Sequence, residues 1–159
     1  MRDKRFVARH RGGPLSKNTH KKLIRWARLC SEHIMPLLKG KPDPRLSIAL
    51  QTAKDWEQEK ASTGAAMKAS LAAHAAAREA ADPIAKAIAR SVGQGVATAH
   101  MADHSMGAAL YALRAINLAG RSVEKEKAWQ IKQLLKLAPE LSELVLSVMA
   151  KKEKSFKLS

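Results

Sequence analysis

Polar side chains that could do chemistry gather on two alanine-rich helices predicted from the middle of the chain. They are His74, Arg78, His100, Asp103 and His104. A helical projection places the first two at the end of one apolar stripe. His100 and Asp103 share one sector of a helix that is apolar nearly all round, and His104 lies at the edge of that sector. An unpaired buried polar group costs about 1–3 kcal/mol. These side chains are therefore expected to pair with one another or to line a cavity.

The cluster allows three interpretations. His100 and His104, four residues apart, could bind a divalent metal with Asp103 or His74 as a third ligand, but HMADH lacks the glutamate of the metalloprotease motif. An active site would use a histidine base, a carboxylate that orients it and an arginine that holds an anion. It would lack a nucleophile, because Cys30 falls on an apolar stripe. A structural cluster that locks three helices together is favoured.

The net charge of +15 invites a nucleic-acid function, but the charge is unevenly distributed. Residues 1–45 carry a net +10, residues 46–150 a net +2 and residues 151–159 a net +3. The candidate basic patch consists of Arg2, Lys4, Arg5, Arg9, Arg11, Lys21, Lys22, Arg25 and Arg28. Such a patch could bind phosphate backbones, whereas only 4% aromatic residues argue against a base-stacking platform. A solvated basic face is the alternative.

The elements that must position these residues are predicted from helix-start signals and hydrophobic periodicity. Starts are indicated at Ser16, at Asp43-Pro44, at Ser62 or Thr63, at Asp82-Pro83, at Ser122 and at Pro139. No stretch alternates in the manner of a strand. We predict an all-α, single-domain bundle of about six to seven helices with no sheet.

Within this bundle, the segment 96–118 is expected to be helical. Whether the helix before it stops near Gly93-Gln94-Gly95 or runs on toward Asp103 stays open, and a break at Asp103, acting as an N-cap, would separate His100 from His104. Gly93-Gln94-Gly95 lacks the third glycine of a dinucleotide loop and is interpreted as a close-packing or kink site. The expected organisation is a basic flexible arm (1–15), a helical domain (16–150) and a basic frayed tail (151–159). The single cysteine, the absence of a membrane-length apolar run and the lack of a signal peptide favour the cytoplasm.

The chain resembles the bacterial immunity proteins of the immunity-five-like family over about its first 130 residues. The residues that carry the resemblance are RHRGGPLSKNTHKKLIRWARLCSEH (9–33), DPRLSIALQTAKDW (43–56), AAHAAARE (72–79) and GQGVATAHMADHSMGAALYALRAI (93–116). The family-like positions are His10, Arg11, Gly12, Gly13, His20, Trp26, Cys30, His33, Asp43, Arg45, Trp56, His74, His100 and His104. His20 and His33 thereby join the candidate polar cavity.

The resemblance implies a small helical cytoplasmic protein that neutralises a toxin of competitor or sister cells by binding it and occluding its active site. It favours a protein partner and a non-enzymatic function. The alternatives are a small metal-binding protein or enzyme that uses the His/Asp cluster in the bundle interior, and a nucleic-acid-associated protein that uses the basic arm. One departure is physical: immunity proteins against basic nucleases are usually acidic, whereas this chain carries +15. Either the partner is acidic, or it is not a nuclease, or this member has another function.

Overall fold

The computed structural model describes residues 3–156 and 158, and these residues form helices and no strand. The α-helices are α1 (Lys17–Ile34), α2 (Pro44–Glu57), α3 (Thr63–Glu79), α4 (Pro83–Ala97), α5 (His104–Leu118), α6 (Val123–Leu137) and α7 (Ser142–Lys152). The predicted all-α bundle is confirmed. No helix in the described ranges is both long enough and apolar enough to cross a membrane.

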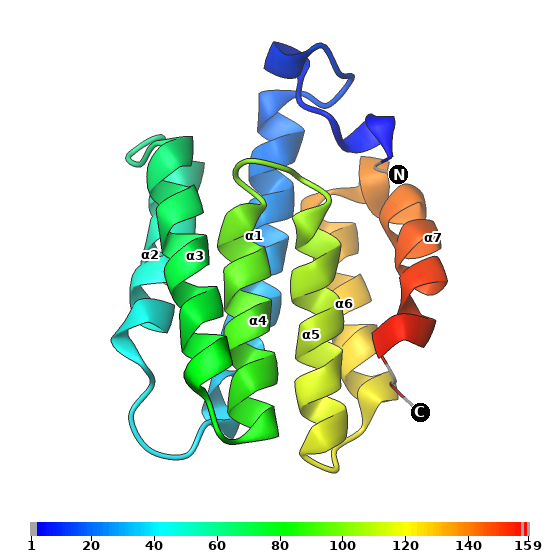
Figure 1. Cartoon of the computed structure of the whole chain (residues 1–159). Coiled ribbons are helices and arrows are strands. Elements are labelled where there is room, and N and C mark those ends of the chain that lie inside the picture. Colours follow the sequence, from blue (N-terminus) through cyan, green and yellow to red (C-terminus); the bar gives the residue numbers. More distant parts are fainter. Residues whose placement is uncertain (1–2, 157, 159) are drawn as a thin grey trace.

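The bundle consists of two layers of three helices (Figure 1). The first layer is α3, α4 and α5, with α4 in the centre, and the second is α2, α1 and α6, with α1 in the centre. Alanine is the commonest buried residue of the first layer, which allows its helices to approach closely. The helix α7 packs along the edge of the bundle against α5 and α6.

Five of the predicted helix starts are confirmed by side-chain caps. In each, a serine or aspartate oxygen accepts a hydrogen bond from a backbone N–H two or three residues further on, which satisfies a donor that the helix leaves unpaired. The capping residues are Ser16, Asp43, Ser62, Asp82 and Ser122. Pro139 instead opens a short 3-10 turn (Pro139–Leu141), and α7 begins after it.

The expectation of continuous helix over 96–118 is wrong, because the chain reverses within it, and the structure places the break at Asp103 that the sequence had left open. The helix α4 continues through Gly93 and Gly95 to Ala97, residues 98–103 form a turn, and α5 begins at His104. The reversal lets α4 and α5 lie antiparallel and bury apolar faces against α1. The turn contains neither glycine nor proline, and Ala99 and Ala102 are buried in it like the alanines of the helices beside it, so the sequence carries no turn residue that marks the break.

The N-terminal segment, residues 3–15, differs from the expected flexible arm. Two 3-10 turns (Lys4–Phe6 and Arg9–Arg11) fold it back on itself, and Phe6 is fully buried in the core shared by α1, α5 and α6. Gly13 is tightly enclosed, since a Cβ atom there would lie 2.1 Å from the carbonyl oxygen of Val7. The segment is therefore held by an apolar anchor and by a turn that excludes a side chain.

The C-terminal segment also differs from the expected frayed tail. Residues 151–152 end α7, and Glu153–Phe156 form a 3-10 turn. The ring of Phe156 meets that of Tyr111 on α5 edge to face, with centroids 4.8 Å apart. Residues 157 and 159 lie outside the described residues.

Candidate functional site

The cluster predicted from the sequence lies on the first helical layer, at its surface and not in the bundle interior. His74 on α3, and His100, Asp103 and His104 around the α4–α5 turn, are half-buried, and Arg78 is exposed. The rings of His100 and His104 have centroids 5.0 Å apart. The Nδ1 atom of His104 donates to the side-chain oxygen of Gln94 at 2.8 Å. The outward position follows from the layer order, because the opposite faces of these helices pack on the second layer.

His74 is locked between two residues of α4. Its Nδ1 atom accepts a hydrogen bond from Arg90 at 2.8 Å, since a guanidinium can only donate. Its ring covers Gly93, where a Cβ atom would lie 2.7 Å from Nε2, so Gly93 is a site of close packing. Burial, together with the charges of Arg90 and Arg78, lowers the pKa of His74 below its ordinary value of 6.5. A neutral imidazole is the form that can accept from Arg90.

The predicted metal set of His74, His100, Asp103 and His104 does not assemble. In the part of the chain that the structure describes, no group of three or more histidine, cysteine, aspartate or glutamate side chains is arranged to hold a metal ion. His74 faces Arg90, and His104 is bonded to Gln94. The break at Asp103 also removes the single helix face on which the metal interpretation depended.

His20 and His33 lie at opposite ends of α1 and do not join this cluster. The Nδ1 atom of His33 lies 2.6 Å from a carboxylate oxygen of Glu126, and the His33 ring stacks on Trp129 with centroids 3.6 Å apart. His20 is buried, and its Nε2 atom donates to the carbonyl oxygen of Thr98 at 2.5 Å. The sequence suggested both as cavity residues, and the structure places His20 in the wall of a cavity near the N-terminus.

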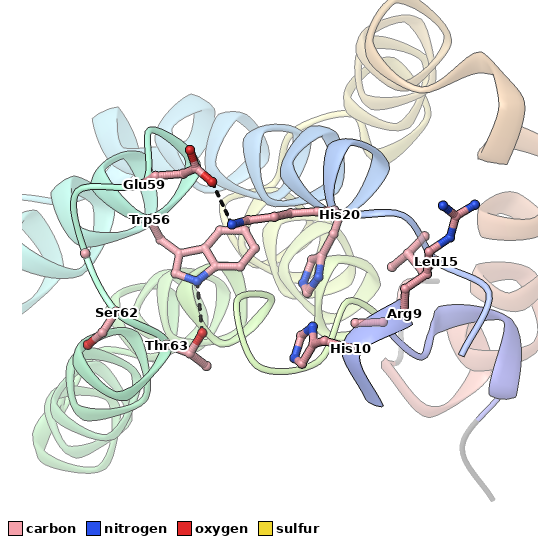
Figure 2. Close-up of a pocket in the computed structure, with 11 residues that line it drawn as sticks. Arg9, His10, Leu15, His20, Trp56, Glu59, Ser62 and Thr63 are labelled. Atoms are coloured by element: carbon pink, nitrogen blue, oxygen red, sulfur yellow. Dashed lines mark hydrogen bonds and ion pairs between the residues drawn. The ribbon is translucent and has the colours of Figure 1, made fainter. Parts of the chain in front are cut away.

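This cavity has a volume of about 670 Å³, and we call it the N-terminal cavity. It lies between the N-terminal segment, the first turns of α1, the end of α2 and the start of α3 (Figure 2). Its lining residues are Ala8, Arg9, His10, Leu15, Lys17, His20, Trp56, Glu59, Ala61, Ser62 and Thr63. Three of them, His10, His20 and Trp56, are positions that the family resemblance had singled out.

Hydrogen bonds hold the walls of the N-terminal cavity in place. The indole N–H of Trp56 donates to the hydroxyl of Thr63 at 3.1 Å, which ties the end of α2 to the start of α3 (Figure 2). The ring of Trp56 lies 4.8 Å from that of His20. Because Nε2 of His20 donates to Thr98, the neutral ring keeps Nδ1 as an acceptor, and burial lowers the pKa of His20.

One carboxylate neutralises two of the cations beside the N-terminal cavity. Glu59 pairs with Lys17 at 2.6 Å and with Lys21 at 3.4 Å, and these ammonium groups lower the pKa of Glu59. Sequence reasoning missed Glu59, because it sits on the turn after α2 with a left-handed φ of 61° and belongs to no motif. Its role becomes visible only when α1 and this turn are side by side.

The basic patch predicted on α1 is paired in the same way. Lys22 contacts Glu140, Arg25 contacts Glu57, and Arg28 contacts both Glu32 and Glu57. In the N-terminal segment, Arg5 pairs with Asp3. The other basic side chains there, Lys4, Arg9 and Arg11, are exposed, and Arg2 lies outside the described residues. Paired cations are poorly suited to replace the counterions of a phosphate backbone. The structure lends no support to nucleic-acid binding through α1.

A family model described as "Imm-5 like putative immunity protein" matches residues 13–137. The chain belongs to this family. The match begins in the turn before α1 and ends with α6, so it contains both helical layers of this immunity-family protein and leaves out α7. No curated protein and no solved structure matches the chain. The resemblance recognised in the sequence is confirmed at the level of the family.

Proposed function

We propose that this protein neutralises a toxin by binding it. The observation that carries the proposal is the family match over residues 13–137, which covers the whole two-layer frame. Neutralisation by binding requires a rigid surface and no reactive group. The one cysteine, Cys30, is fully buried, and burial raises the pKa of its thiol, which makes it unsuited to act as a nucleophile.

The N-terminal cavity is the surface that we assign to the toxin. Trp56 and Leu15 supply apolar wall, and Arg9 and His10 stand exposed at its edge. Aromatic and arginine side chains around a concave pocket are typical of the residues that dominate protein–protein binding energy. The walls are fixed by the Trp56–Thr63 and His20–Thr98 hydrogen bonds, so little conformational entropy is lost when a partner side chain enters.

The proposal is tested by growth rescue. The toxin encoded beside this protein's gene is expressed alone and together with the protein, and the two are then purified as a complex from the rescued cells. Rescue with a stoichiometric complex is the expected result. Continued growth arrest in cells that contain soluble, folded protein would overturn the proposal.

A matched pair of variants tests the assigned surface. Arg9→Glu and Arg11→Glu make the same charge change on the same 3-10 turn, but only Arg9 lines the N-terminal cavity. Arg9→Glu should weaken toxin binding about tenfold or more, which corresponds to roughly 1.4 kcal/mol. Arg11→Glu should leave the affinity within about twofold. Equal losses in both variants would move the contact away from the cavity.

A further inference from the structure

A second concave site lies on the first layer, far along α4 and α5 from their connecting turn. It has a volume of about 240 Å³, and we call it the α4–α5 pocket. Lys86 and Arg90 reach it from α4, and Tyr111, Arg114 and Leu118 from α5. It does not overlap the N-terminal cavity, whose walls come from α1, α2, α3 and the N-terminal segment.

The three cations of the α4–α5 pocket have no carboxylate to neutralise them. No acidic residue lines the pocket, and within residues 3–156 and 158 none of Lys86, Arg90 and Arg114 forms an ion pair. Arg90 is bonded to His74, a neutral partner that orients the guanidinium without cancelling its charge. Positive charge is therefore concentrated in one small concavity.

The physical consequence is a preference for an oxyanion. Like charges converging on a concave site repel one another, and a bound anion relieves that repulsion. Arginine presents a planar array of donors that matches a carboxylate or phosphate with two parallel hydrogen bonds.

We propose that the α4–α5 pocket binds a carboxylate from an acidic segment of a protein partner. Leu118 is 43% exposed and gives the same site an apolar wall, which suits an apolar residue next to the acidic one. A volume of about 240 Å³ admits one anionic group and its neighbour, not a continuous phosphate backbone. The inference rests on the proposed function only in taking the partner to be a protein. It agrees with an acidic partner, which is one of the explanations for the charge of +15.

The direct test is an NMR titration of the full chain that needs no toxin. The probe is a capped five-residue peptide with two glutamates flanking a leucine, compared with its glutamine counterpart and with inorganic phosphate. The glutamate peptide should shift the amide signals of Tyr111, Arg114 and Leu118, and the glutamine peptide should not. Binding of phosphate without binding of the glutamate peptide would overturn the carboxylate assignment, and binding of neither would overturn the site.

A pair of double variants separates the pocket from the general charge of the protein. Lys86→Gln with Arg114→Gln empties the pocket of two cations and keeps the Arg90–His74 bond, whereas Arg78→Gln with Arg121→Gln removes two exposed cations outside it. The pocket variant should bind the glutamate peptide at least about tenfold more weakly. Equal weakening in the control variant would show long-range attraction and overturn the pocket.

Growth rescue links the pocket to the proposed function without confusing the two. If the wild type rescues and the pocket variant rescues less at limiting expression, the acidic segment belongs to the toxin. Undiminished rescue by the pocket variant would overturn the pocket as a toxin contact while the proposed function stands. If the wild type does not rescue, the proposed function falls, and the peptide titration still decides whether the pocket binds a carboxylate.

Discussion

The N-terminal cavity and the α4–α5 pocket are both lined by basic side chains, but their charges are treated differently. Beside the cavity, Glu59 neutralises Lys17 and Lys21. In the pocket, Arg90 is bonded to the neutral imidazole of His74, and none of the described residues that line the pocket is acidic. The positive charge that each site can offer to an anion therefore depends on which cations the fold pairs with carboxylates. A charge count along the chain does not reveal it.

The largest effect should come from removing the apolar anchor of the N-terminal segment, which forms one wall of the N-terminal cavity. Phe6→Ala should destabilise the protein by about 3–5 kcal/mol, because Phe6 is fully buried and its removal leaves a void. Lys4→Ala, on the same 3-10 turn but exposed, should cost little. Urea denaturation measures both. Similar small losses in the two variants would show that the segment is not anchored through Phe6.

A smaller effect should come from the glycine beneath His74. Gly93→Ala would place a Cβ atom 2.7 Å from His74, so the ring must move and lose its bond to Arg90, at a cost of about 1–3 kcal/mol. Gly64→Ala, in the same kind of helix but with its nearest contact at 3.8 Å, should be neutral or stabilising. Thermal melting of the two variants decides between local packing and a general intolerance of substitution.

Stability should fall as the pH drops below about 6.5. The pKa values of His20 and His74 are lowered in the folded protein, mainly by burial, so the unfolded chain takes up protons first as the pH decreases. The stability that the two neutral histidines contribute is therefore fully present above their pKa in the unfolded chain, and it is lost as the pH falls through their pKa in the folded protein. His20→Gln and His74→Asn, which keep one hydrogen-bonding atom in place, should each flatten the curve of unfolding free energy against pH between 7 and 5. Unchanged curves in both variants would contradict the burial argument.

The smallest effect on stability is expected from a variant that removes the carboxylate beside the N-terminal cavity and so makes its charges resemble those of the α4–α5 pocket. Glu59→Gln removes the carboxylate that neutralises Lys17 and Lys21, all at the surface, so the melting temperature should hardly change. The N-terminal cavity should then bind inorganic phosphate more tightly than in the wild type, as the α4–α5 pocket's unpaired cations lead us to expect. NMR titration near Lys17 measures this. No gain in anion affinity would show that pairing by Glu59 does not control the charge of the cavity.

Much of the fold could be predicted because its signals are local. A serine or an Asp-Pro pair acts within one helical turn, so five caps were readable from the sequence. The place of the reversal after Ala97 stayed open because its turn contains neither glycine nor proline and buries alanines like those of the helices beside it. A buried loop that bonds its carbonyl to His20, on another helix, has no local mark.

The candidate sites were predicted less well because they depend on contacts between distant parts of the chain. His74 and His104 were found by helical projection, but their partners Arg90 and Gln94 lie on the helix between them. The cations of the α4–α5 pocket belong to the segment whose net charge is nearly zero, and the acids that balance them in the count lie elsewhere. A net charge near zero over a segment does not show which cations form ion pairs, and only the three-dimensional arrangement does.

The contact between Phe156 and Tyr111 has a consequence for how members of this family diverge. Tyr111 lines the α4–α5 pocket from within the matched region, whereas Phe156 lies beyond Leu137, where the family match ends. A residue that lines the pocket is thus packed against a part of the chain that lies outside the family match. Two proteins can share the six-helix frame, differ only in their C-terminal extension, and still present different recognition surfaces.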